Sequence, residues 1–505
     1  MPPASTTAGA GHRANSDSIG PVLKPPAIDG LVARLGRWSA GRGPLYVLLA
    51  ARLRELIDDG ELPPDTPLPP DRAFATALAV GRGTVVAAYD VLCQEGKIVR
   101  RQGSGTRVAS AVLPRDRTRA GDTANPLFLH LLERPDHVVQ LTCATPTTVP
   151  PEVTSAYTRA LSLIRSDGLG YHPAGHPALR GALAERYTRR GLPTEPDQIL
   201  VTTGAQQALS LVTRLLVRPG DKVVVEAPTY PGALEVFREA AAIPRPVSSV
   251  DGLDWPALVD VLGRERPALG YLIPTHHNPT GTVLPTPARR RVAEVAAVHG
   301  VPLVDDEALV DLGFDGAEPA PLAVFAPDNA VLTVGSLSKI VWGGLRVGWV
   351  RASAALVARL ARLKAVHDLG SDVASQLAAV DLLADLDAIR ARRAGELRRR
   401  HDRLRAELGA RLPDWRFRPA AGGQTLWVRL PHGDAVSFAQ LALRHGIALL
   451  PGGSLDVSGG SAACLRIPFL APPDELGKAV RQLAGAWRDY SPSADPPTTL
   501  APLAI

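Results

Sequence analysis

Short apolar segments alternate with amphipathic segments over most of the chain after residue 138. The apolar segments are DQILVTTG, KVVVEAP, ALGYLIP, VPLVDD and AVLTVGS, and helical patterns such as AQQALSLVTRLL lie between most of them. Strands that are apolar on both faces are typical of a mostly parallel sheet covered by helices. The pattern therefore predicts an α/β domain over residues 138–490.

Polar residues follow several of these predicted strands. In open parallel sheets, ligands bind beyond the carboxyl ends of the strands. Tyr230, Asn278, Asp306 and Lys339 each come at or just after such an end. We therefore expect them to lie at one edge of the sheet.

Residues 44–109 show a different pattern. A helical face is marked by Leu45, Leu48, Leu49, Leu53, Leu56 and Ile57. PPDRAFATALA starts with proline and aspartate, and RGTVVAAYDVLCQEG follows after a short break at Val80 and Gly81 and closes at Gly96. KIVRRQGSGTRVA reads as strand, glycine-rich turn and strand. The order predicts a helix-turn-helix followed by a wing.

The remaining segments lack a regular pattern. Residues 1–43 are rich in Ala, Gly, Ser and Pro and predict a flexible extension. Residues 110–137 carry mixed charge with Pro and Gly, which suits a linker. The Pro-rich residues 491–505 predict a disordered tail.

Charge and cysteine content narrow the class of protein. The net charge of +6 over 505 residues permits an anionic partner without requiring one. The three cysteines lie far apart, so we expect neither a disulfide framework nor a metal site. The chain has no uninterrupted apolar run of about 18 residues. We expect a soluble, cytoplasmic protein with no membrane contact.

Lys339 stands among small residues in TVGSLSKIVWGGLRVGW. A desolvated lysine amine has a lowered pKa and can form a Schiff base with an aldehyde. Pyridoxal 5'-phosphate would need phosphate donors beside this lysine. The backbone of Ala205 and Gln206 at a helix start, together with Ser336, Ser338 and Arg346, could supply them.

Three further residues suit the ring of such a cofactor. Tyr230 could stack on the ring, Asn278 could bind its phenolic oxygen, and Asp306 could pair with its ring nitrogen. Each of these motifs is common as ordinary structure when it stands alone. Their order along the chain carries the interpretation.

The order TTGAQQA, PTYPG, NPTG, DDE, SLSK and GLRVGW closely resembles fold-type I aminotransferases of class I. The resemblance implies a large domain with a smaller C-terminal α/β domain. It also implies that Arg466 binds a substrate or effector carboxylate and that Tyr171 reaches the phosphate of a partner subunit. The family commonly has a tyrosine that binds the phenolic oxygen, and Ala308 and Leu309 stand at those positions, so Asn278 would hold that oxygen alone.

The segment with the anchors PPDR, RGTV, LCQEG and RRQGSGT resembles the winged helix-turn-helix of GntR-type repressors. The resemblance implies that Arg72, Arg82 and Thr84 contact DNA and that Gly103 brings the wing to the minor groove. Basic and acidic residues are equally numerous here, although basic residues gather on the wing. A helical module used only for protein contacts is the alternative.

Together the two segments resemble MocR-type regulators of the GntR family. The resemblance implies a pyridoxal-phosphate-dependent transcription regulator that binds a double-stranded DNA operator and forms a head-to-tail homodimer. Its effector would be an amino compound or the cofactor itself, and residual transaminase activity is compatible with the motifs. The alternative is a catalytically active class I aminotransferase with a vestigial DNA-binding module.

Overall fold

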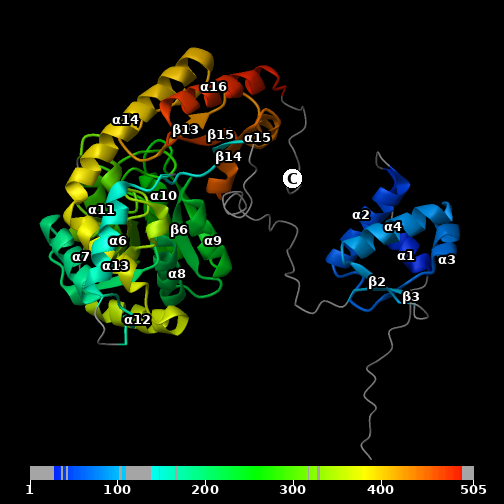
Figure 1. Ribbon diagram of the computed structural model, residues 1–505, viewed down its shortest axis with the longest axis horizontal. Coiled ribbons are helices and arrows are strands. Elements are labelled where there is room, and N and C mark those ends of the chain that lie inside the picture. The colour runs from blue at the N-terminus through cyan, green and yellow to red at the C-terminus, as the bar shows by residue number, and fades with distance from the viewer. Residues whose placement is uncertain are drawn as a thin grey trace, which may run out of the picture. The chain divides into compact units, whose positions relative to one another are not determined.

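The chain folds into two compact units, Met1–Thr123 and Ala124–Ile505. The computed structural model describes residues 28–35, 38–40, 44–101, 105–109, 138–146, 148–164, 169–316, 318–326 and 330–491. The predicted tail from residue 492, the predicted linker up to residue 137, and Gly103 lie outside the described residues. Figure 1 shows the helices and strands of both units.

The first unit contains the predicted helix-turn-helix and wing. Its helices α2 (Leu45–Asp58), α3 (Asp71–Ala77) and α4 (Arg82–Gln94) enclose a core with the buried side chains Leu49, Leu53, Phe74, Val85 and Tyr89. The strands β1 (Pro67–Leu68), β2 (Ile98–Arg101) and β3 (Gly105–Val108) form an antiparallel sheet in the order β1-β3-β2.

A further helix, α1 (Ile28–Leu35), belongs to this unit. Leu31 and Leu35 are 0% and 1% exposed and lie in the same hydrophobic core as α2 and α4. Their spacing of four residues places both on one helix face. The prediction of a flexible extension is therefore wrong at residues 28–35, because two leucines in a short, otherwise unpatterned stretch gave too weak a signal.

The second unit is built on a seven-stranded sheet in the order β5-β11-β10-β9-β8-β6-β7. All neighbours are parallel except β11, which runs antiparallel to both β5 and β10. The strands are β5 (Ile199–Thr202), β6 (Lys222–Ala227), β7 (Ile243–Ser248), β8 (Leu269–Leu272), β9 (Leu303–Asp306), β10 (Val331–Ser336) and β11 (Gly348–Arg351). The mostly parallel sheet confirms the pattern of continuous apolar strands.

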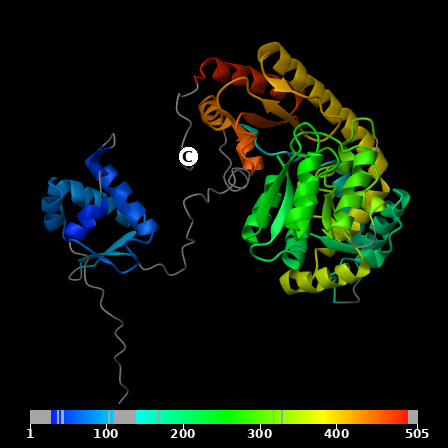
Figure 2. The same cartoon turned by 180° about the vertical axis from the view of Figure 1, so that it is seen from behind.

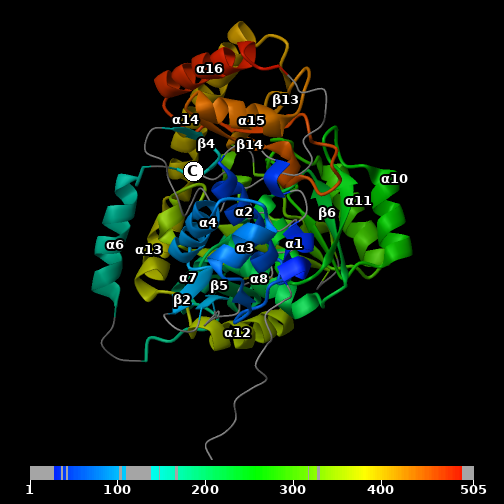
Figure 3. The same ribbon diagram turned by 90° about the vertical axis from the view of Figure 1, so that its right-hand side faces the viewer.

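Helices cover both faces of this sheet (Figures 1 and 2). One face packs against α8 (Ala205–Leu216), α9 (Pro231–Glu239) and α12 (Ala354–Asp368). The opposite core includes residues of α6 (Pro151–Leu163), α7 (Pro177–Arg189), α10 (Trp255–Asp260), α11 (Thr286–Val298) and α13 (Val373–Ala384). In Figure 3, α6 and α13 run side by side at the edge of the unit.

A smaller five-stranded sheet follows in the order β12-β13-β15-β14-β4. It joins strand β4 (Val139–Leu141), from the start of the unit, to β12 (Arg416–Phe417), β13 (Thr425–Arg429), β14 (Ile447–Pro451) and β15 (Cys464–Pro468). β4 pairs in parallel with β14, so the chain enters this unit through its smaller sheet. Helices α14 (Leu386–Arg411), α15 (Ala435–Arg444) and α16 (Pro473–Arg488) complete it.

Among the described helices, none is by itself long and apolar enough to cross a membrane. Helices α3 and α4 meet the length and composition criteria only as a pair, which is bent by 118°.

Candidate cofactor site and DNA-binding face

A cavity of about 190 Å³ lies among the strand ends of the larger sheet. It brings together the residues that the sequence places in a cofactor site: Ala205, Gln206, Tyr230, Asn278, Asp306, Ser336, Ser338, Lys339, Arg346 and Arg466. These residues come from six segments of the chain. The larger sheet gathers most of them because its parallel strands deliver their carboxyl ends to one edge, whereas Arg466 comes from β15 of the smaller sheet.

One end of the cavity is suited to an anion. Helix α8 begins at Ala205 after Gly204, and its first backbone N–H groups lack intrahelical partners. A Cβ added to Gly204 would lie 3.1 Å from Nη2 of Arg346, so this guanidinium lies against the helix start. Ser336 and Ser338 approach within 2.9 Å through their hydroxyls. A cation beside the positive end of a helix dipole is favourable only with an anion between them, which fits a phosphate.

Lys339 is one of the residues that line the cavity. Its Nζ donates hydrogen bonds to the Ala144 carbonyl and the Thr145 hydroxyl, both at 2.9 Å. Burial lowers the pKa of this amine, and the guanidinium of Arg466 adds to the effect. A larger fraction of the amine is therefore neutral and nucleophilic than in an exposed lysine.

Asp306 is separated from its acidic neighbours by the alternation of side chains along β9. Its carboxylate accepts hydrogen bonds from the Tyr271 hydroxyl at 2.6 Å and from the Ala308 amide at 2.9 Å. Asp305 accepts from the Leu322 amide, and Glu307 accepts two bonds from Arg190. Only Asp306 of the three lines the cavity.

Two other predicted residues are held by neighbours within the cavity wall. The Tyr230 hydroxyl donates to Oε1 of Gln206 at 3.2 Å, while Nε2 of Gln206 donates to the Gly232 carbonyl at 2.9 Å. Burial raises the pKa of Tyr230 to about 12, so its hydroxyl stays protonated. A Cβ at Gly232 would lie 2.4 Å from the Tyr230 ring, so this glycine makes room for it.

Arg466 is 2% exposed and points its guanidinium at two segments. Nη1 lies 3.4 Å from Oδ1 of Asn278, and Nη2 donates to the Thr142 carbonyl. Burial lowers the pKa of Arg466 to about 10. No carboxylate faces this buried cation in its hydrogen bonds among the described residues, which suits a ligand carboxylate.

Tyr171 does not line the cavity. Its side chain is 63% exposed on the surface of the unit.

Several lining residues have no counterpart in the sequence predictions. Cys143, Ala144 and Thr145 follow β4, and Gln424 and Thr425 come from the start of β13. Gln424 Nε2 lies 3.4 Å from the Lys339 carbonyl. Nothing in the local pattern of these segments indicates a site, because they reach the cavity only through the packing of the smaller sheet.

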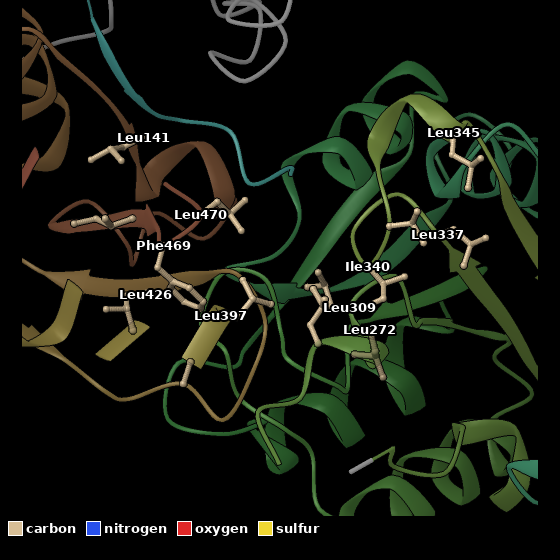
Figure 4. Close-up of a cluster of buried hydrophobic side chains, with 14 of the residues drawn as sticks. Leu141, Leu272, Leu309, Leu337, Ile340, Leu345, Leu397, Leu426, Phe469 and Leu470 are labelled. Atoms are coloured by element: carbon tan, nitrogen blue, oxygen red, sulfur yellow. The ribbon is translucent and has the colours of Figure 1, made fainter. Parts of the chain in front are cut away.

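Leu309 takes part in both the cavity wall and the core. It lines the cavity with Ala308 and lies near Leu272 and Ile340 in the apolar cluster shown in Figure 4. Tyr230 is the one tyrosine among the described lining residues, and its hydroxyl is bound to Gln206. The cavity wall therefore contains no tyrosine free to replace the missing donor within the part of the unit that is described.

In the first unit, the predicted DNA contacts lie at the starts of two helices. Arg72 is the second residue of α3, and Arg82 and Thr84 are the first and third of α4. Both arginines are exposed, and the side chain of neither one forms an ion pair or hydrogen bond within the described residues. They are therefore available to phosphates and base edges.

Three basic residues of the wing make contacts within the unit. Lys97 pairs with Asp58 at 2.5 Å, and Arg107 donates to the Asp65 carbonyl at 3.0 Å. Arg100 lies 2.8 Å from Asp90 and 5.6 Å from the centre of the Tyr89 ring. Of the wing cations expected from the sequence, Lys97 and Arg100 are thus paired with acidic residues of the same unit.

Residues 138–483 match the model of the family "Aminotransferase class I and II". The chain belongs to this family. Residues 45–108 match the model "Bacterial regulatory proteins, gntR family", whose domain binds DNA. An aminotransferase class I and II domain behind a gntR-family domain is the architecture of MocR-type regulators, and the protein is a regulator of this type.

Two relatives and one solved structure show that the chain is similar both to aminotransferases and to regulators. The 2-aminoadipate transaminase of Thermus thermophilus is 32% identical over 341 residues, which are 65% of this chain and 85% of the relative. The probable rhizopine catabolism regulatory protein MocR of Rhizobium meliloti is 29% identical over 436 residues, 79% and 87% of the two chains. The crystal structure of LysN, the alpha-aminoadipate aminotransferase of Thermus thermophilus, superimposes with a TM-score of 0.67 at 30% identity, over 73% and 96%.

Pyridoxal phosphate is the cofactor of this family, and the LysN structure contains its derivative N-(5'-phosphopyridoxyl)-L-leucine. The geometry of this MocR-type chain fits the cofactor at three points. An anion cradle lies between the α8 start and Arg346, a partly buried amine is present at Lys339, and a buried carboxylate lies at Asp306. The fold class and the cofactor expected from the sequence are thereby confirmed.

Proposed function

We propose that this MocR-type regulator senses an amino compound, or pyridoxal phosphate itself, at the cavity around Lys339 and adjusts DNA binding accordingly. One observation carries the proposal. The cavity unites Lys339, Asp306 and Arg466 in a chain whose gntR-family domain presents Arg72 and Arg82 without intramolecular partners among the described residues. A candidate ligand site and a candidate DNA-binding face in one chain support the proposal.

Each cavity residue has a role that its contacts support. Pyridoxal phosphate, when bound, supplies an aldehyde that bonds covalently to amines and a ring that withdraws electrons. Lys339 would provide the chain's own amine for that bond, and Asp306 would pair with the ring nitrogen. Ala205, Gln206, Ser336, Ser338 and Arg346 would hold the phosphate, Tyr230 would cover the ring, and Asn278 would bind the phenolic oxygen.

Arg466 would bind the carboxylate of the effector. The segment Thr142–Thr145 accepts hydrogen bonds from both Lys339 and Arg466. An amine that replaces Lys339 and a carboxylate that takes Arg466 would release this segment from both. Because the segment directly follows β4, the first described strand of the second unit, ligand binding would affect the start of that unit.

We also propose a head-to-tail homodimer, since the class I and II aminotransferase fold is typically dimeric. Exposed apolar side chains gather in sequence between residues 161 and 171, namely Leu161, Leu163, Ile164, Leu169 and Tyr171. Such side chains are typical of an interface. In that arrangement the exposed Tyr171 would reach the phosphate in the partner subunit.

A working aminotransferase is the second candidate, and the complete set of Lys339, Asp306, Arg346 and Arg466 favours it. We expect Leu309 to slow turnover, because its apolar side chain lines the cavity at a position where the family commonly has a tyrosine hydroxyl. The exposed arginines of the helix-turn-helix also speak against a vestigial module.

Spectroscopy of Lys339→Ala tests the site directly. The purified wild-type protein with pyridoxal phosphate should show a visible absorption band, and Lys339→Ala should lose it, whereas the surface variant Lys222→Ala should keep it. Amino acids should change the band and the affinity for the DNA upstream of the chain's own gene. An unchanged band in Lys339→Ala, or fast turnover with a keto acid and no effect on DNA affinity, would contradict the proposal.

A further inference from the structure

Tyr271 lies behind the cavity and makes one directed contact with it. The residue belongs to β8, next to β9 in the sheet, and is 0% exposed. Its hydroxyl donates to Oδ2 of Asp306 at 2.6 Å. Its ring lies against Phe237 in an edge-to-face arrangement, with 5.9 Å between ring centroids. The ring packing fixes the direction from which the hydroxyl approaches the carboxylate.

The direction of this hydrogen bond is set by the surroundings. Burial raises the pKa of Tyr271 well above its ordinary value, and the charge of Asp306 adds to the effect. The phenol therefore stays protonated and can act as the donor. Asp306, in turn, uses its two oxygens for two different donors, Tyr271 from β8 and the Ala308 amide from its own segment.

The charge state of Asp306 depends on a small number of groups. Burial raises the pKa of its carboxyl, while the Tyr271 hydrogen bond is the strongest influence that lowers it, followed by the Ala308 amide. Of the charged neighbours, Glu307 on the same segment raises the pKa and Lys339 after β10 lowers it. Tyr230 at the start of α9 is neutral and also senses the charge of Asp306.

We propose that Tyr271 is a positioning residue for the cofactor: its hydroxyl orients the Asp306 carboxylate toward the ring nitrogen and keeps that carboxylate charged. A carboxylate in a dry site remains ionised only when donors stabilise its charge. The ring nitrogen stays protonated only opposite a charged partner. Tyr271 thus acts on the cofactor through Asp306, without touching it.

The inference rests on the proposed role of Asp306, and Tyr271→Phe tests it. The substitution removes one oxygen atom and keeps the packed ring. The full-length variant should bind pyridoxal phosphate about tenfold more weakly near neutral pH. The defect should be largest at about pH 6 and shrink toward about pH 9, since a higher pKa leaves more of Asp306 neutral at low pH. Fluorescence quenching during titration with pyridoxal phosphate gives the dissociation constant at each pH.

Tyr187→Phe is the matched control. Tyr187 is also 0% exposed and also donates to a carboxylate, that of Glu307 at 3.2 Å, on the other face of the sheet. Tyr187→Phe should keep the wild-type dissociation constant for pyridoxal phosphate, even if the substitution lowers the stability of the protein. Equal defects in the two variants, or a defect in Tyr271→Phe that does not change with pH, would overturn the proposal in favour of a structural role.

A double-mutant cycle with Asp306→Asn tests whether Tyr271 changes cofactor affinity through Asp306. If Tyr271 acts through the charge of Asp306, then Tyr271→Phe should change cofactor affinity little in the Asp306→Asn background. Additive losses would overturn the inference. If Asp306→Asn alone leaves cofactor affinity and the visible band unchanged, the proposed role of Asp306 itself fails, which is a different outcome.

Discussion

At the scale of single residues, three consecutive acids show how position decides chemistry. Asp306 faces the cavity, whereas the Glu307 carboxylate is bound by Arg190 and Tyr187. Burial raises the pKa of Asp305 to about 7, and the charge of Glu307 adds to this. The sequence motif predicts an acid at this point, and strand alternation selects which one reaches the ligand.

Arg82 gives a prediction for DNA recognition. Arg82→Ala should weaken binding to the DNA upstream of the gene and reduce the salt dependence of the binding constant by roughly one unit of slope, if the residue contacts one phosphate. Electrophoretic or fluorescence titrations at several salt concentrations measure both quantities. Arg52→Ala removes the same charge from an arginine that is paired with Glu55 and should change neither. Equal binding by both variants would mean that Arg82 is not part of the recognition face.

Leu309 gives a prediction for the chemistry of the site. In Leu309→Tyr the new hydroxyl should donate to the phenolic oxygen of the cofactor and stabilise its negative charge. The pH midpoint of the visible absorption band should then fall by about one unit. Transamination of an added amino acid should become faster. Leu309→Phe adds a similar ring without the hydroxyl and should leave the midpoint near that of the wild type. A similar midpoint shift in both variants would indicate a steric effect instead.

At the scale of elements, packing against other parts of the chain positions both the segment that follows β4 and helix α1. Thr142, Ala144 and Thr145 contact Arg466 and Lys339 only because β4 pairs with β14 at the edge of the smaller sheet. Helix α1 has only eight residues, too few for a long periodic pattern, and is held by two buried leucines. Such elements depend on partners that are distant in the sequence, so local patterns indicate them poorly.

Helix α1 predicts a stability change in the DNA-binding unit. Leu31→Ala should destabilise that unit by about 2–5 kcal/mol, because it removes a fully buried side chain and leaves a cavity. Thermal or urea unfolding of the full chain measures the loss. Ala33→Ser on the exposed face of the same helix should change stability by less than about 0.5 kcal/mol. No loss in Leu31→Ala would mean that α1 does not belong to the core of the unit in solution.

At the scale of the whole molecule, the two units have separate hydrophobic cores and, in the proposed function, separate tasks. The first unit has a core of its own that includes α1, α2, α3 and α4, and the second has cores on both faces of its larger sheet. A ligand that binds only one folded unit stabilises that unit by mass action.

Cofactor binding should therefore separate the unfolding transitions of the two units. At a concentration about 100-fold above its dissociation constant, pyridoxal phosphate should stabilise the second unit by about 2.7 kcal/mol and leave the first unit nearly unchanged. Differential scanning calorimetry with and without the cofactor measures this. Lys339→Ala should show a smaller upward shift. A rise of both transitions together would indicate that the units unfold as one.

The sequence by itself determined the winged helix-turn-helix, the α/β fold of the second unit, the order of the cofactor motifs and the identity of the cofactor. These follow from local periodicity, from strand-end positions and from motif order, which need no knowledge of distant contacts. The tertiary structure alone decided that Thr145 and Ala144 hold Lys339, that Tyr271 lies behind Asp306, and that Lys97 and Arg100 of the wing are paired with acidic residues. It also placed α1 in a core. The physical reason is that these contacts join segments remote in sequence, whose packing is fixed only when the sheets assemble.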